Sequence, residues 1–166
     1  MAAKRQTRKV GDVLKIGFGD GTHSYCQIST NPLVIFFDLR TESELPISEI
    51  VRLPIAFKLW VFNTDLKKGV WERLGNSPVA LEHLQQPLMF KQDIINGKLT
   101  LHHESFVDSN YEREATISEC HGLERAAVWE ASHVEDRLRD HFNGVENKWV
   151  KSMAIKIGPR RGGDSG

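Results

Sequence analysis

Long apolar runs, a cysteine framework and metal-binding motifs are all missing from this sequence. The longest apolar run, Leu33–Phe37, has the length of a strand and falls far below the roughly 20 residues of a membrane helix. The two cysteines, Cys26 and Cys120, are too few for a disulfide framework and are not spaced as a metal knuckle. The basic start, MAAKRQTRK, has no apolar segment behind it and does not read as a secretory signal. These absences favour a cytoplasmic protein with reduced thiols and without a membrane span, a metal or a cofactor.

Net charge is also absent, because 22 basic and 22 acidic residues cancel. The charges are unevenly distributed: residues 1–9 carry +4 and the segment after Pro159 carries +1, which leaves −5 on residues 10–159. A nucleic-acid-binding face needs a positive patch that releases counterions from phosphate. The acidic body therefore argues against a nucleic-acid partner and is compatible with a basic protein partner.

The length of 166 residues fits about one domain. An apolar fraction of 40% and a charged fraction of 27% are ordinary for a globular protein. Residues 1–9 are rich in charge without periodicity, and residues 159–166 are rich in Pro, Arg and Gly. The sequence thus predicts a flexible basic tail over 1–9, a single globular domain over 10–158 and a flexible tail over 159–166.

Residues 11–29, GDVLKIGFGDGTHSYCQIS, carry the strongest local signal. Apolar residues alternate in 13–16 and in 25–28, and the loop between them holds Asp20-Gly21. Asp-Gly tolerates the positive φ that a tight turn needs, so this stretch predicts a β-hairpin. Two strands alone bury too little apolar surface in water, and later segments must cover them.

Further strands are predicted from short apolar or alternating runs that turn residues bound. The Asn96-Gly97 turn between two of them predicts a second hairpin. These runs are residues 33–39, 55–62, 70–74, 89–92, 98–102, 115–120, 123–129 and 149–157.

One helix near the C-terminus is clearly predicted. Ser132 and Glu135 have the spacing of a capping box, which satisfies two free N–H groups at a helix start. Val134, Leu138 and Phe142 form one apolar stripe, and Asn143-Gly144 follows as a left-handed stop. The expected fold class is α+β, mostly β: a curved antiparallel sheet or small barrel, opened by the first hairpin, with this well-capped helix.

Catalytic chemistry has weak support in the sequence. Cys26 could act as a nucleophile only with a histidine in reach, and it lies inside a predicted strand, where nothing stabilises a thiolate. His102 and His103 are adjacent on a strand and point to opposite faces, so they do not form a metal site together. The glycine-bearing loop 17–21 leads into a strand, whereas a phosphate-binding loop leads into a helix. A structural role is the better interpretation for each, and no catalytic residue is predicted.

Aromatic and acidic side chains are the remaining candidates for recognition. Tyr25, Phe37 and Trp71 could form a cage for a methylated amine if the fold were a small SH3-like barrel, although core packing is the commoner use of such residues. Two polar loops carry clustered acidic residues, and loops on a rigid sheet often hold binding residues. The acidic candidates are Glu42, Glu44, Glu49, Asp108, Glu112, Glu114 and Glu119.

The opening GDVLKIGFGDGTHSYCQI resembles the start of the bacterial immunity protein 26 family, in which a GDV-apolar-KI segment, a DG turn and a returning strand follow one another. LVIFFDL, GVWERLGNSPV and FKQD at residues 90–93 are similar to the family in order and kind. The resemblance implies a small, mostly β, cytoplasmic protein that is encoded beside a polymorphic toxin. It implies neutralisation of that toxin by tight binding, and it supplies no catalytic residues.

The leading hypothesis is therefore a non-enzymatic immunity protein that occludes the active site of a cognate toxin. Its expected partner-binding residues are Glu42, Glu44, Glu49, Asp108, Glu112, Glu114 and Trp71. The first alternative is an SH3-like binding module for a peptide or a modified side chain. The second alternative is a cysteine hydrolase built on Cys26. The sequence specifies no oligomeric state.

Overall fold

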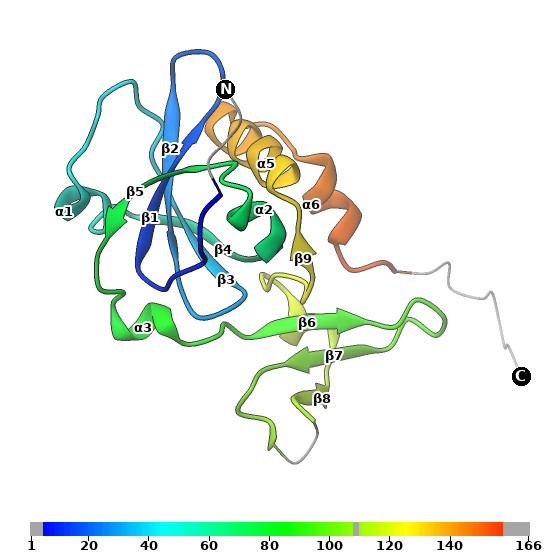
Figure 1. Cartoon of the computed structure of the whole chain (residues 1–166). Coiled ribbons are helices and arrows are strands. Elements are labelled where there is room, and N and C mark those ends of the chain that lie inside the picture. The colour runs from blue at the N-terminus through cyan, green and yellow to red at the C-terminus, as the bar shows by residue number, and fades with distance from the viewer. Residues whose placement is uncertain (1–4, 108–109, 158–166) are drawn as a thin grey trace, which may run out of the picture. The chain divides into compact units, whose positions relative to one another are not determined.

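A six-stranded mixed sheet dominates the N-terminal part of the computed structural model, which describes residues 5–107 and 110–157. The strand order is β5-β1-β2-β3-β4-β9, in which β9 runs parallel to β4 and the other neighbours are antiparallel. Figure 1 shows the central strands side by side. The strands are β1 (Asp12–Gly17), β2 (His23–Ile28), β3 (Leu33–Phe37), β4 (Ile55–Val61), β5 (Glu72–Asn76) and β9 (Val128–Trp129).

The chain divides into two compact units. Among the described residues, the first unit comprises 5–87 and 127–151 and contains the six-stranded sheet. The second comprises 88–107, 110–126 and 152–157 and contains the three-stranded antiparallel sheet β6 (Met89–Gln92), β7 (Leu99–His102) and β8 (Glu112–Glu114). The helices are α1 (Ile47–Ile50), α2 (Asn63–Lys67), α3 (Leu81–Leu84), α4 (Ile117–Cys120), α5 (Ala131–Asn143) and α6 (Lys148–Met153).

The predicted first hairpin is confirmed and forms the centre of the larger sheet. Gly17 pairs with His23, and the register continues to Val13 opposite Gln27. Every residue of β2 and of β3 is buried. A strand becomes buried on both sides only when each face of its sheet is covered.

Two different layers cover these faces. On one face Val13, Tyr25, Ile35 and Phe37 pack against Ile50 of α1. On the other face, Phe36 makes an edge-to-face contact with Trp71 at 5.7 Å, and Phe57 lies under a guanidinium of α5. Each fully buried aliphatic side chain contributes about 1.5–3 kcal/mol to folding. The sheet is therefore a rigid platform for its loops.

The fold class is α+β with somewhat more strand than helix, and the sheet does not close. The small-barrel form of the prediction is thus wrong: β5 and β9 are the two ends of an open order. The sheet is also mixed rather than wholly antiparallel, because β9 pairs with β4 in parallel.

The predicted helix is present as α5, but its start is not the predicted capping box. The N-cap is Glu130, which makes no capping hydrogen bond with its side chain, and the helix begins at Ala131. A carboxylate oxygen of Asp65 on α2 accepts a hydrogen bond from the Ala131 N–H at 2.9 Å. A residue distant in sequence thus accepts a hydrogen bond from a free N–H group at the helix start. The predicted left-handed end at Gly144 is confirmed, because its φ is 67°.

Two predicted strands are helices. Residues 115–120 contain α4, where Thr116 and Glu119 exchange the two hydrogen bonds of a capping box. Residues 149–157 contain most of α6, in whose first turn the N–H groups of Trp149 and Val150 donate to the Asn147 side chain at 3.0 Å each. In both segments a side-chain cap outweighs an alternating pattern.

Candidate functional site

A group of exposed acidic residues in the first unit lies on the connection from β3 to α1. We call residues 41–49 the acidic loop; Glu42 and Glu44 lie in its first half and Glu49 on α1, and all three are exposed. Glutamate is unfavourable in the interior without a partner, so these side chains face solvent by default. The loop therefore presents three carboxylates on the scaffold of the larger sheet.

Strand β2 holds the acidic loop in place. The backbones of His23 and Thr41 exchange two hydrogen bonds, of 2.9 and 3.0 Å. The hydroxyl of Tyr25 donates to the Ser43 carbonyl at 3.2 Å and accepts from the Leu45 N–H at 3.1 Å. The same hydroxyl lies 2.7 Å from Nε2 of the buried His23. The loop is thus fixed at three points by residues of a fully buried strand.

One of the three carboxylates already has an internal partner. Glu44 accepts a hydrogen bond from Nζ of Lys15 at 2.6 Å, which lowers the pKa of Glu44 and raises that of Lys15. Within the part of the chain that the structure describes, Glu42 and Glu49 form no ion pair shorter than 4.0 Å. Two uncompensated carboxylates are therefore available to a cationic partner.

The other predicted acidic residues belong to the second unit. Glu112 and Glu114 lie on β8, and each faces a lysine of the same unit. Lys91 is 2.6 Å from Glu112 and Lys98 is 4.0 Å from Glu114. These lysines offset part of the negative charge that β8 presents to solvent. Asp108 lies outside the described residues.

Trp71 is not an exposed anchor, because its side chain is only 2% exposed. Tyr25 and Phe37, the other members of the imagined aromatic cage, are 0% and 2% exposed. Burial of all three and the open sheet overturn the SH3-like alternative, since a cage needs ring faces that a ligand can reach.

The cysteine-hydrolase alternative is also wrong. Cys26 is completely buried on β2, and burial raises the pKa of its thiol. A nucleophilic cysteine must be accessible and must form a thiolate readily. In the described part of the chain no group of three His, Cys, Asp or Glu residues is arranged to hold a metal ion.

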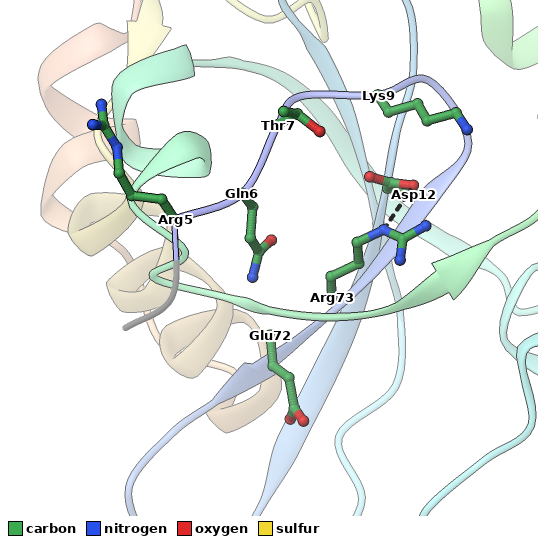
Figure 2. A pocket seen from close by; sticks show the side chains of 7 residues that line it. All are labelled: Arg5, Gln6, Thr7, Lys9, Asp12, Glu72 and Arg73. Atoms are coloured by element: carbon green, nitrogen blue, oxygen red, sulfur yellow. Dashed lines mark ion pairs between the residues drawn. The ribbon is translucent and has the colours of Figure 1, made fainter. Parts of the chain in front are cut away.

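The N-terminal segment 5–9 borders a cavity of about 640 Å³ on the first unit (Figure 2). The Gln6 N–H donates to the Lys67 carbonyl at 2.8 Å, and Arg8 Nη2 donates to the carbonyls of Ser29 and Leu33. These contacts have no signal in the sequence, from which a flexible tail over 1–9 is predicted. Burial lowers the pKa of Arg8.

Charged side chains of this cavity do not converge on a common point. Figure 2 shows Asp12 facing Arg73, with 3.1 Å between carboxylate oxygen and Nε, while Arg5 and Glu72 extend away from this pair. Asp12 is 2% exposed and also accepts a hydrogen bond from the Asn76 amide at 2.9 Å. The pair thus joins β1 to β5 and has a structural role.

A feature that sequence reasoning missed is an apolar hairpin tip in the second unit. Ile94 and Ile95 are 96% and 92% exposed between β6 and β7. The Asp93 carboxylate accepts from the N–H groups of Ile95 and Asn96, at 2.7 and 3.0 Å, and these bonds lower the pKa of Asp93. The predicted Asn96-Gly97 turn was the available signal, because it places the two preceding residues at the tip.

None of the described helices combines the length and the apolar character that a membrane span requires.

The family model described as immunity protein 26 matches residues 9–100, more than half of the chain. The matched segment runs from the start of the larger sheet to the first residues of β7, and it includes the acidic loop. No curated protein and no solved structure matches significantly. Proteins of an immunity family neutralise a toxin, typically without being enzymes. The chain belongs to the immunity protein 26 family, and this membership implies a toxin-neutralising role.

Proposed function

We propose that this protein binds one cognate toxin in the cytoplasm and neutralises it by covering the toxin's active site or substrate groove. The family match is the observation that carries this proposal. Neutralisation by binding requires an interface with the toxin and does not require that this protein catalyse a reaction. A stable complex of this kind buries about 1,600 Å² in total, which a domain of this size can supply from one face.

The acidic loop is the proposed steering surface. Its carboxylates are exposed, and Tyr25 and His23 fix the backbone that carries them. Negative charges on such a loop raise the association rate with a positively charged toxin, and salt screens this effect. Pre-ordering of the loop reduces the entropy that binding would otherwise cost.

Acidic residues of β8 are a second, weaker contributor in this proposal. Glu112 and Glu114 are partly neutralised by Lys91 and Lys98, so their loss changes the long-range field less than loss of the acidic loop. Asp108 stays a sequence-based expectation.

Co-expression with the toxin encoded beside this protein tests the function. Growth should be rescued, and the two proteins should purify as one complex. A neighbour that is harmless alone, or that forms no complex, contradicts the proposal.

Charge-neutral variants test the surface. The triple variant Glu42→Gln, Glu44→Gln, Glu49→Gln should lower the association rate constant about tenfold at low salt and leave the dissociation rate nearly unchanged. The double variant Glu112→Gln, Glu114→Gln removes carboxylates that Lys91 and Lys98 partly neutralise, and it should change the association rate by less than about threefold. An association rate constant of the triple variant within about threefold of the wild-type value would exclude the acidic loop as the steering surface.

A further inference from the structure

A second cavity of the first unit, of about 440 Å³, lies at the start of α5. Its walls come from α2, from Val70 just before β5 and from the first turns of α5. Asp65, Glu130 and Glu135 supply three acidic side chains, and no basic side chain is among its described lining residues. We call this the α5 acidic cavity.

Helix stabilisation accounts for only part of this acidity. Asp65 accepts a hydrogen bond from the Ala131 N–H, and Glu130 is the N-cap residue, so both lie where a helix dipole favours negative charge. Glu135 lies in the second turn, where the dipole effect has faded. Its ordinary role on the helix surface would be solvation, yet it is partly buried against the cavity wall.

Glu135 is poorly compensated in this position. Burial is the main cause that raises the pKa of its carboxyl, and neighbouring Asp136 adds to it, while Arg139 and the indole of Trp71 oppose it. Glu135 therefore favours the approach of an additional positive charge. Arg139 is a positive charge that acts on Glu135, and its guanidinium is shared with Asp136 at 3.6 Å and with the ring of Phe18.

The buried indole of Trp71 is a neighbour of Glu135. Trp71 is 2% exposed, and its Nε1 makes no hydrogen bond of standard geometry. The indole is nevertheless close enough to the Glu135 carboxyl to lower its pKa, so it is a neighbour of a residue that lines the cavity, although Trp71 is not itself a lining residue. A buried N–H that stays unpaired costs about 1–3 kcal/mol. A ligand that draws the Glu135 carboxylate into line with the indole would recover part of this cost.

Exposed apolar side chains complete the cavity. Phe62 is 44% exposed and Val70 is 47% exposed, and both line it. An arginine or lysine side chain has a matching division, with an apolar stem and a cationic head. The stem can cover Val70, and the cation can approach the Phe62 ring as well as the carboxylates.

We propose that the α5 acidic cavity receives one arginine or lysine side chain of the protein partner, with its cation between Glu130 and Glu135. The identity of that partner as the toxin rests on the proposed function. The cavity itself is independent of the acidic loop, because none of its lining residues lies in 41–49. It would add a short-range anchor to the long-range steering of the loop.

Variants of the cavity test its use by the toxin. Glu135→Gln and Phe62→Ala should each weaken toxin binding about tenfold, mainly through faster dissociation. Glu146→Gln is the matched control. Glu146 is an exposed residue of the same unit whose carboxylate lies 3.9 Å from Nζ of Lys151, and its substitution should change the affinity for the toxin by less than about twofold. Wild-type affinity in both cavity variants overturns the inference that the toxin uses the cavity.

A small-molecule probe tests the cavity without the toxin. L-argininamide and L-lysinamide should each shift the Trp71 indole N–H resonance saturably in the millimolar range, whereas norleucinamide should not. Glu135→Gln should abolish the response while the rest of the spectrum is unchanged. No saturable shift up to about 100 mM overturns the cavity as a cation site. If the wild-type protein binds no toxin at all, the proposed function fails. The titration with L-argininamide and L-lysinamide then tests by itself whether the cavity binds a cation.

Discussion

Replacing Tyr25 by Phe should destabilise the acidic loop more than any exposed substitution, because one hydroxyl serves three polar partners. Those partners are Nε2 of His23 at 2.7 Å, the Leu45 N–H at 3.1 Å and the Ser43 carbonyl at 3.2 Å. His23 is 3% exposed and cannot turn to water, so its unpaired nitrogen costs about 1–3 kcal/mol. The two loop groups can rehydrate, which limits each loss to about 0.5 kcal/mol.

The expected loss in the free energy of unfolding is therefore about 2–4 kcal/mol. Urea unfolding measures it, with an unchanged m-value showing that the folded state stays compact. Hydrogen exchange adds a local readout, since the Leu45 amide should lose its protection. Tyr111, the other tyrosine, is 49% exposed, and Tyr111→Phe is the control, expected within about 0.5 kcal/mol of wild type. A Tyr25→Phe loss below about 0.5 kcal/mol with Leu45 still protected would refute the reasoning.

Four further predictions follow from other parts of the chain. Gly11→Ala should lower the free energy of unfolding in urea by about 1–3 kcal/mol, because the φ of Gly11 is +93° and a Cβ would lie 2.5 Å from the Ser77 carbonyl oxygen. Gly17 has open space around it, so the control Gly17→Ala should be nearly neutral. Equal losses in the two variants would be inconsistent with this account. The carboxyl of Asp20 has a pKa of about 2, held down mainly by the hydroxyl and the N–H of Thr22 and further by Arg40. Thr22→Val removes the hydroxyl, so the NMR titration midpoint of Asp20 should rise towards 3.8, and an unchanged midpoint would exclude the Thr22 hydroxyl as the largest cause. Because this pKa is depressed by folding, its contribution to stability is present above about pH 4 and is lost as the pH falls towards 2. Cys26 should resist a thiol alkylating agent in the native state and react after unfolding, and rapid native labelling would show that β2 is accessible. In the second unit Ile94→Ser should stay within about 0.5 kcal/mol of wild type, whereas Leu101→Ala should cost about 2–5 kcal/mol; a costly Ile94→Ser would mean that the hairpin tip is packed.

Local patterns predicted the elements whose chemistry is local. The first hairpin, the strand at Leu33 and the hairpin around Asn96-Gly97 are all present, because turn residues and alternation decide them within a few residues. The apolar stripe of α5 is also confirmed, with Val134 and Leu138 completely buried. Each of these predictions depended on groups that are neighbours in sequence.

Long-range contacts explain most of the errors. The start of α5 is satisfied by Asp65, which is 66 residues away, so no capping rule applied to residues 130–135 could find it. The parallel pairing of β9 with β4 likewise depends on how the chain returns to the sheet. Trp71 was predicted to bind the partner, but it is buried and packs edge-to-face on Phe36 of the central sheet.

The candidate site was partly visible in the sequence. Clustered glutamates marked the acidic loop, but the buried Tyr25 hydroxyl that positions it has no local signature. The α5 acidic cavity joins Asp65, Val70 and Glu135, residues that only the folded chain brings together. Charge can be read from sequence, whereas concavity and burial cannot.

The most direct test of the central claim is a titration of the neighbouring toxin's activity with the purified protein. Toxin activity should fall in proportion to added protein and vanish at molar equivalence when concentrations exceed the dissociation constant. Full toxin activity in the presence of a large molar excess of folded protein would contradict the account.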